Sequence, residues 1–331
     1  MSHMTLEKTD LVSDLDECAT PFVPYFAYAV RQSVPILSTL FTNKLQRQVS
    51  MDDVSFELGR VMKLRGTHEW PWVWEESKFW QCTAMRKAWP SYKAFRDEVV
   101  DLYWSYLDVS RKKNCKPLPT VIEGLHSARA HNRRVSFLSN GPDHMVFTKA
   151  GDNALDELAT YICAIETPEP PASSKLTDEM LDYGRSRVKQ FLSRKMKCKV
   201  KSFPSDWAKP DPRGLQWLMK ELGTTPDTTV FIGDSLPGDG GVAQACGVPF
   251  LWAAYGANIS EEYTRCIEHH FIHPDDRKPL PKNPKYPPML TRWGAARWAQ
   301  VLDHLGPEEL PLLPTILEKS ERPQPTDGLN H

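Results

Sequence analysis

Residues 228–247 read TTVFIGDSLPGDGGVAQACG, and this stretch decides the fold class. Thr228–Ile232 is a short apolar run that predicts a buried strand, and Gly241–Cys246 predicts a helix that Gly247 ends. A second apolar run, Val248–Ala253, predicts another strand directly afterwards. A strand, a glycine-rich turn, a helix and a strand in this order are typical of an α/β domain.

The same alternation extends over most of the chain that precedes this stretch. Strands are predicted at Thr9–Asp14, Arg134–Leu138 and Cys198–Phe203. Helices are predicted at Thr120–Ala130, Ala154–Ile165, Thr177–Lys195 and Pro212–Leu222. Thr120 is expected to cap the first of these helices, with Glu123 as its reciprocal partner. The chain is therefore predicted to contain an α/β domain with a mostly parallel sheet.

Two long segments depart from this alternation. From Thr20 to about Pro117, apolar residues recur at helical spacing and glycine is scarce, which predicts a mostly helical region. After Cys266, closely spaced prolines mark an extended segment, followed by a predicted helix at Arg292–Leu305. The residues from Ser320 onward are polar and are expected to be disordered.

The composition excludes several classes of protein. The 331 residues include 41 Lys and Arg against 42 Asp and Glu, so no overall positive field draws the chain to nucleic acid or to an anionic membrane. No apolar run approaches the ~20 residues of a membrane-spanning helix, and the N-terminus lacks a signal-peptide pattern. The seven cysteines include no C-x-x-C pair, which favours free thiols in the cytoplasm. No feature of the composition indicates an oligomeric state.

Four polar motifs lie at or near the predicted carboxyl ends of strands, where open α/β sheets bind their ligands. They are Asp14-Leu15-Asp16, Ser139-Asn140-Gly141, Lys209-Pro210 and Gly233-Asp234-Ser235-Leu236-Pro237-Gly238-Asp239. The first and the last supply pairs of carboxylates, the second suits an anion cradle, and the third places a cation before a helix. Each motif alone could be a turn, a cap or a surface feature, but the ordered set favours one shared site.

Together these motifs resemble those of the haloacid-dehalogenase-like (HAD) superfamily, in the same order and at comparable distances, over about residues 8–256. The most specific part is Gly-Asp-Ser at 233–235, with Asp239 five residues after Asp234. The resemblance implies an α/β fold with a Rossmann-like, doubly wound parallel sheet and an inserted helical cap. It divides the chain into a core segment at 5–19, the cap at 20–117, the α/β core at 118–266 and a proline-rich C-terminal extension at 267–331.

The resemblance also implies a chemistry, that of a Mg²⁺-dependent phosphatase acting on a small phosphorylated metabolite. Asp14 would be the nucleophile that attacks phosphorus and forms an aspartyl-phosphate. Asp16 would protonate the leaving oxygen and then activate water. Mg²⁺ would be held by Asp14, by the backbone carbonyl of Asp16 and by Asp234.

The remaining motif residues would bind the phosphoryl group and orient its neighbours. Ser139, together with the backbone N–H of Asn140, would hold the phosphoryl oxygens. Lys209 would pair with Asp14 and neutralise the transferring charge. Asp239 and Ser235 would lie behind these residues and orient them.

Two residues of the first motif bear on the branch of the family. Dehalogenases and phosphonatases lack an acid at the position of Asp16, so its presence indicates phosphate-ester chemistry. Cys18 departs from the family pattern, which usually has threonine four residues after the nucleophile. Because a thiol donates only weak hydrogen bonds, we expect a changed orientation of Asp16 and a reduced rate, without loss of catalysis.

Three alternatives remain open, and one of them is an inactive member of this family, which only Cys18 suggests. The same intermediate could pass its phosphoryl group to another hydroxyl, as in a phosphotransferase or mutase of this family. The run 185–201 carries eight basic residues and no acid, so it could follow a polyanion in a nucleic-acid-end phosphatase or a binding protein. A solvated helix face is the favoured interpretation of this run, and nucleic acid is not expected as a partner.

Candidate substrate contacts in the cap are few. Its tryptophans are expected mainly in a packed core, although they could also receive a large flat or apolar group; they are Trp70, Trp72, Trp74, Trp80, Trp89 and Trp104. Arg65, His68 and Arg86 are possible substrate contacts, with surface positions favoured for each. His269, His270 and His273 are expected to be structural.

Overall fold

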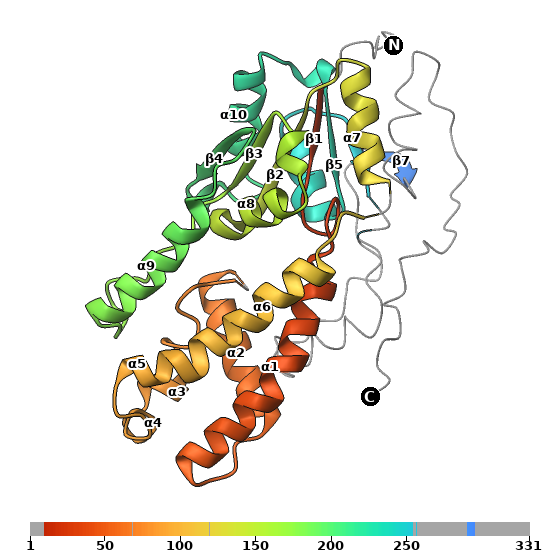
Figure 1. Ribbon diagram of the computed structural model, residues 1–331. Helices are drawn as coiled ribbons and strands as arrows, with labels where there is room; N and C mark the ends of the chain where they lie inside the picture. Colours follow the sequence, from red (N-terminus) through yellow and green to blue (C-terminus); the bar gives the residue numbers. More distant parts are fainter. Residues whose placement is uncertain (1–9, 68, 119, 254–255, 257–289, 295–331) are drawn as a thin grey trace, which may run out of the picture.

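A computed structural model describes residues 10–67, 69–118, 120–253, 256 and 290–294 (Figure 1). Its centre is a seven-stranded sheet in the order β4-β3-β2-β1-β5-β6-β7, in which every neighbouring pair is parallel. The strands are β1 Asp10–Ser13, β2 Val135–Pro142, β3 Tyr161–Ile165, β4 Lys199–Phe203, β5 Thr229–Gly233, β6 Phe250–Trp252 and β7 Leu290–Gly294. The predicted Rossmann-like parallel sheet is therefore confirmed.

Helices cover both faces of this sheet, as a doubly wound fold requires. The core helices are α7 Val121–Ala130, α8 Asp143–Asp152, α9 Asp178–Leu192, α10 Arg213–Leu222 and α11 Gly241–Ala245. Leu11 of β1 packs with α7 and α8 on one face, and the next residue, Val12, packs with α10 and α11 on the other. Because β1 is buried on both faces, its apolar residues form a continuous run and not an alternating pattern.

A helical unit, residues 22–114, lies between β1 and β2 in the chain and beside the sheet in space (Figure 1). Its helices are α1 Phe22–Leu45, α2 Met51–Arg65, α3 Lys78–Gln81, α4 Thr83–Arg86, α5 Tyr92–Phe95 and α6 Asp101–Asn114, with a π-helical turn at Arg96–Val100 before α6. All six of its tryptophans are buried in one hydrophobic cluster, as expected. The predicted domain boundaries at 19/20, 117/118 and 266/267 remain a proposal.

The helical unit also contacts α9, which leans toward it from the core (Figure 1). Trp70 Nε1 donates to Pro168 O at 2.8 Å, and Trp72 Nε1 donates to Met180 O at 3.0 Å. The Trp72 ring lies directly against Gly184, where a Cβ would come within 2.1 Å of the indole nitrogen. The helical unit is thus held by α9 as well as by its two covalent connections to the sheet.

One predicted helix was wrong. Ala154–Ile165 was expected to be helical, but the structure places a 3₁₀ turn at Leu155–Glu157 and strand β3 at Tyr161–Ile165. All five residues of β3 are buried. A short, wholly apolar run is compatible with a buried strand or a buried helix, so its pattern alone could not distinguish them.

The capping of α7 was also predicted incorrectly. The helix begins at Val121, but Thr120 has a left-handed backbone with φ of 68° and no side-chain cap bond. An N-cap residue normally has an extended backbone that directs its oxygen toward the amides of the first turn. The left-handed conformation of Thr120 does not allow this arrangement.

The other predicted elements of the core agree with the structure to within a few residues. The exception is α8, which lies in a stretch for which no element was predicted. At the C-terminal end, the predicted helix at Arg292–Leu305 conflicts with strand β7 over 292–294. Its remainder lies outside the described residues, as do His269, His270, His273 and the polar end of the chain. Within the described part of the chain, no helix is both long enough and apolar enough to cross a membrane.

Gly184→Ala is expected to destabilise the protein by about 1–3 kcal/mol, because the new methyl group would push the Trp72 ring away from α9. Helix propensity alone would favour alanine at this position. Urea unfolding measures the difference. Gly214→Ala is the control, since its Cβ would lie 3.4 Å from the nearest atom, Leu138 Cδ1, and its midpoint should stay equal or rise slightly. Equal midpoints for Gly184→Ala and the wild type would contradict the close contact.

Candidate active site

The site begins where β1 ends. Asp14 follows the last residue of β1, and its backbone N–H donates to Ile232 O of β5 at 2.8 Å. Ser13 Oγ donates to Asp14 O at 2.7 Å, so hydrogen bonds hold both the backbone N–H and the backbone carbonyl of Asp14. The Asp14 side chain is almost entirely buried. Its position is therefore set by two adjacent parallel strands.

Lys209 brings a positive charge to Asp14. Its Nζ lies 2.7 Å from Asp14 Oδ1 and 2.6 Å from Asp239 Oδ1, and its side chain is buried. The backbone of Lys209 is held by Asn140, whose Nδ2 donates to Lys209 O at 3.0 Å and whose Oδ1 accepts from Lys209 N at 2.7 Å. The second and third motifs are thus joined through one side chain.

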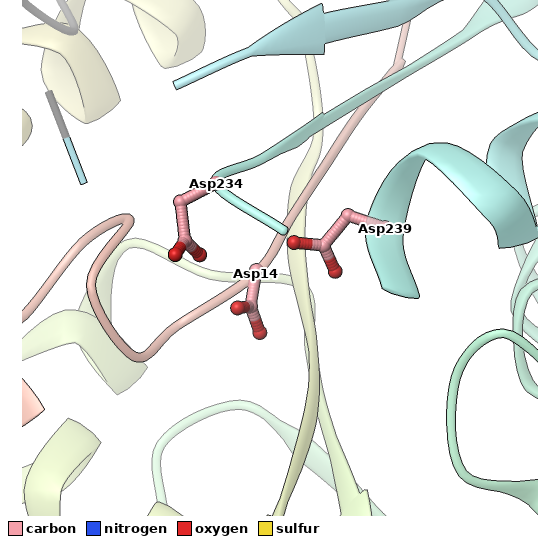
Figure 2. Close-up of side chains that lie close together, drawn as sticks. All are labelled: Asp14, Asp234 and Asp239. Atoms are coloured by element: carbon pink, nitrogen blue, oxygen red, sulfur yellow. The ribbon is translucent and has the colours of Figure 1, made fainter. Parts of the chain in front are cut away.

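The turn after β5 supplies the remaining acids. One carboxylate oxygen each from Asp14, Asp234 and Asp239 lies within 4.8 Å of the others. Figure 2 shows the three side chains around one small space, with Asp14 after the end of β1, Asp234 directly after β5 and Asp239 on the helical segment that follows. Carboxylate oxygens are the donors that hard divalent cations prefer. The cluster therefore fits a metal such as Mg²⁺.

Close packing fixes Asp239 within this turn. Its Oδ2 accepts from the backbone N–H of Ser235 at 3.0 Å. Gly233 leaves room for this carboxylate, because a Cβ there would lie 2.3 Å from Asp239 Cγ. Ser235 Oγ accepts from Gly238 N at 3.1 Å, so this hydroxyl stabilises the turn itself.

The second motif lies at the end of β2 and faces Asp16. Ser139 is buried, and its Oγ accepts from Gly141 N at 3.1 Å. A Cβ on Gly141 would lie 3.3 Å from both Ser139 Oγ and Asp16 Oδ2. The side chains of Ser139 and Asp16 therefore border the same small space, which a side chain at position 141 would fill.

Asp16 is not a member of the three-acid cluster. Both of its carboxylate oxygens accept from Lys149 Nζ, at 2.7 and 2.8 Å. Lys149 belongs to α8 and was not among the predicted site residues, and neither was Glu69, which lies 3.6 Å from the same ammonium. The sequence does contain one indication of Lys149, because it is the only lysine in the mainly apolar stretch His144–Ala150. A lysine that is buried in such a stretch needs a partner of opposite charge.

Cys18 lies in the loop that follows Asp14. Its Sγ is 3.4 Å from Ser13 Oγ and 3.8 Å from Ile232 O, on the same strand pair that fixes Asp14. Burial, and then the charge of Asp14, raise the pKa of this thiol well above its usual range. Cys18 therefore remains protonated and serves as a neutral packing group.

Burial dominates the electrostatics of the acid cluster. It raises the pKa of Asp14 from 3.8 to about 7, with Lys209 opposing the shift and Asp239 adding to it. Burial also raises the pKa of Asp234 to about 8, with the negative charges of Asp14 and Asp239 adding to the effect. Asp14 and Asp234 are thus harder to ionise than free aspartates, and a bound divalent cation would oppose this shift.

Most of the other candidates make structural contacts. Arg65 pairs with Glu76, and its Nε donates to Glu76 Oε2 at 2.7 Å, while Arg86 is exposed. His68 lies outside the described residues. In the basic run, four residues pair with acids at 2.5–2.9 Å: Arg185 with Glu169, Arg187 with Asp101, Arg194 with Asp152 and Lys197 with Glu157. These pairs favour the interpretation of a solvated, neutralised face.

Comparison with known proteins matches part of the chain to one family model. Residues 206–276 match the family model described as HAD-hydrolase-like. This matched region includes Lys209 and the motif at 233–239, two of the four motifs that resemble those of this family. A search of curated proteins gave no significant match.

Solved structures with similarity to the chain include one described as a phosphoglycolate phosphatase and two described as HAD proteins. A predicted phosphoglycolate phosphatase from Haemophilus somnus 129PT is 15% identical with a TM-score of 0.41, over 90% of this chain and 97% of that one. A HAD phosphatase from Thermococcus onnurineus is 16% identical with a TM-score of 0.42, over 74% and 85%. A HAD-superfamily hydrolase of subfamily IA from Geobacter sulfurreducens PCA is 16% identical with a TM-score of 0.38, over 74% and 87%.

Asp234→Asn is expected to stabilise the metal-free protein, and increasingly so as the pH rises. The folded-state pKa of Asp234 is raised from 3.8 to about 8, so between these values the folded state retains a proton that the unfolded state has lost. Stability from this group is present at low pH and is lost as the pH rises toward 8. The variant removes the loss, so its advantage in Tm over the wild type should grow from about pH 4 to about pH 8.

Thermal unfolding in EDTA measures this difference. Asp227→Asn is the control, because Asp227 is exposed and precedes β5, at the opposite end of that strand from Asp234. A constant difference in Tm across the pH range would contradict the raised pKa.

Proposed function

We propose that the protein is a Mg²⁺-dependent phosphatase that hydrolyses small phosphoric monoesters through an aspartyl-phosphate on Asp14. The observation that carries this proposal is the convergence of Asp14, Lys209 and Asp234 at the carboxyl ends of β1 and β5. A nucleophilic carboxylate, a buried ammonium and a second acid in one space suit the attack of an anion on a phosphate.

The metal would be held by Asp14, Asp234 and the backbone carbonyl of Asp16. When bound, Mg²⁺ would reduce the repulsion between the anionic nucleophile and the anionic phosphate. Asp239 is already engaged with Lys209 and with the N–H of Ser235. Its role is therefore to orient Lys209 against Asp14.

The phosphoryl group would lie between the ends of β1 and β2. Ser139 Oγ and the Asn140 backbone N–H would donate to its oxygens, and Lys209 would neutralise charge as the bond to Asp14 forms. The Asn140 side chain supports this arrangement indirectly, because it holds the backbone of Lys209. These residues together would define one position for the phosphorus atom.

Asp16 would move the protons. As an oxygen of Asp14 attacks phosphorus, the bond from phosphorus to the ester oxygen breaks and Asp16 gives that oxygen a proton. The ionised Asp16 would then take a proton from water, which attacks the aspartyl-phosphate and releases inorganic phosphate. The closeness of Asp16 to Ser139 at Gly141 supports a common substrate position.

Asp14→Asn should lower phosphate release by roughly 10⁴-fold or more, because an amide cannot form the acyl-phosphate. A panel of phosphorylated metabolites and an aryl phosphate, with inorganic phosphate as the readout, measures the loss and identifies the preferred ester. Asp227→Asn provides the matched surface control and should retain full turnover. Wild-type rates in Asp14→Asn would rule out Asp14 as the nucleophile. Consumption of ester without release of inorganic phosphate would indicate transfer to another hydroxyl.

Removal of Mg²⁺ with EDTA should stop turnover, and added Mg²⁺ should restore it. Binding to the folded state should also raise the Tm, by an amount equivalent to about 2.7 kcal/mol at a hundredfold excess over Kd. Asp234→Asn should lose most of this shift, because a neutral amide is a weaker ligand than a carboxylate. An equal Mg²⁺-dependent shift in wild type and variant would place the ion elsewhere.

A further inference from the structure

Lys149 is the most completely buried cation near the site. It lies in α8, its side chain has no exposed surface, and its ammonium donates to both oxygens of Asp16. Lys149 therefore places an enclosed ammonium group directly beside the carboxylate of Asp16.

The second partner of Lys149 comes from the helical unit. Glu69 Oε2 lies 3.6 Å from Lys149 Nζ, and the Glu69 side chain is buried in the segment between α2 and α3. Phe22, at the start of α1, places its ring 5.2 Å from the same ammonium. Among the described residues, Glu69 Oε1 has no hydrogen-bond partner. One ammonium is thus shared by an acid of the core and an acid of the inserted unit.

An arrangement of this kind is costly unless every charge is matched. Removing an ion from water costs several kcal/mol, and only close partners offset that cost. Asp16 retains some exposure to the site, with 22% of its side chain accessible, whereas Lys149 has none. The ammonium therefore cannot reach a substrate, and any effect on the reaction must pass through Asp16.

We propose that Lys149 is a positioning residue for Asp16, and that Glu69 secures it from the helical unit. This inference rests on the proposed function. The contacts of Lys149 Nζ with both carboxylate oxygens of Asp16 hold this carboxyl group in one orientation beside Ser139. In that orientation Asp16 can give its proton to the leaving oxygen. The interaction matters most when the leaving oxygen needs a full proton.

The dependence on the leaving group provides the test. Lys149→Met should lower kcat/KM by about 10²-fold for an alkyl or phenyl phosphate, whose leaving oxygen is strongly basic. For 2,4-dinitrophenyl phosphate, whose leaving group departs without protonation, the loss should be about threefold or less. Asp16→Asn should show the same pattern. A uniform loss for all esters would overturn the inference and leave Lys149 a structural residue.

A second variant tests whether misfolding explains the loss, because Lys149→Met leaves Asp16 and Glu69 without the cation that they share. Lys149→Met combined with Glu69→Gln removes one cation and one anion, and it should show the same dependence on the leaving group. Arg111→Met is the matched control, because Arg111 is a buried cation whose ion pairs are with Asp108 and Asp152. This control should lower kcat/KM equally for every ester.

The same experiment separates failure of the inference from failure of the proposed function. If the wild type releases phosphate, Asp14→Asn does not and Lys149→Met loses activity uniformly, only the inference fails. If the wild type releases no phosphate from any ester, the proposed function fails and the inference fails with it.

Discussion

The structure depends on one electrostatic constraint, the confinement of Asp14, Asp234 and Asp239 within a few ångströms of one another. Lys209 neutralises part of this charge, and the raised pKa values of Asp14 and Asp234 show that the balance is incomplete. Such a cluster persists only if the backbone that carries it cannot relax. The central pair β1 and β5, buried on both faces and hydrogen-bonded up to Asp14, provides that rigidity.

A second cluster of buried charges lies near the first and consists of Asp16, Lys149 and Glu69. Asp16 is only two residues from Asp14, yet it pairs with Lys149 of α8 and not with Lys209. The two carboxylates of the first motif therefore have separate cations and separate surroundings. Distinct environments of this kind are how two like residues take different tasks in one reaction.

The sequence predicted the sheet and its polar edge because both depend on local patterns. Apolar runs that end in Asp14 and Gly233 mark strands, and parallel strands bring their carboxyl ends to one edge, so the meeting of Asp14 and Asp234 followed from topology. Lys149 and Glu69 could not be found in this way, because neither lies in a motif and their pairing depends on how the helical unit packs. β3 was misassigned because its five apolar residues have no distinguishing period.

The contact between Trp72 and Gly184 limits how the helical unit can move relative to α9. If the helical unit were held only by its two chain connections to the sheet, it could rotate freely about them. Here the Trp72 indole packs against Gly184 of α9 and donates to Met180 O at 3.0 Å. A rotation of the helical unit about its two connections to the sheet would therefore break these contacts. Movement of the helical unit relative to the sheet therefore requires either that α9 moves with it or that the contacts of Trp72 with α9 break.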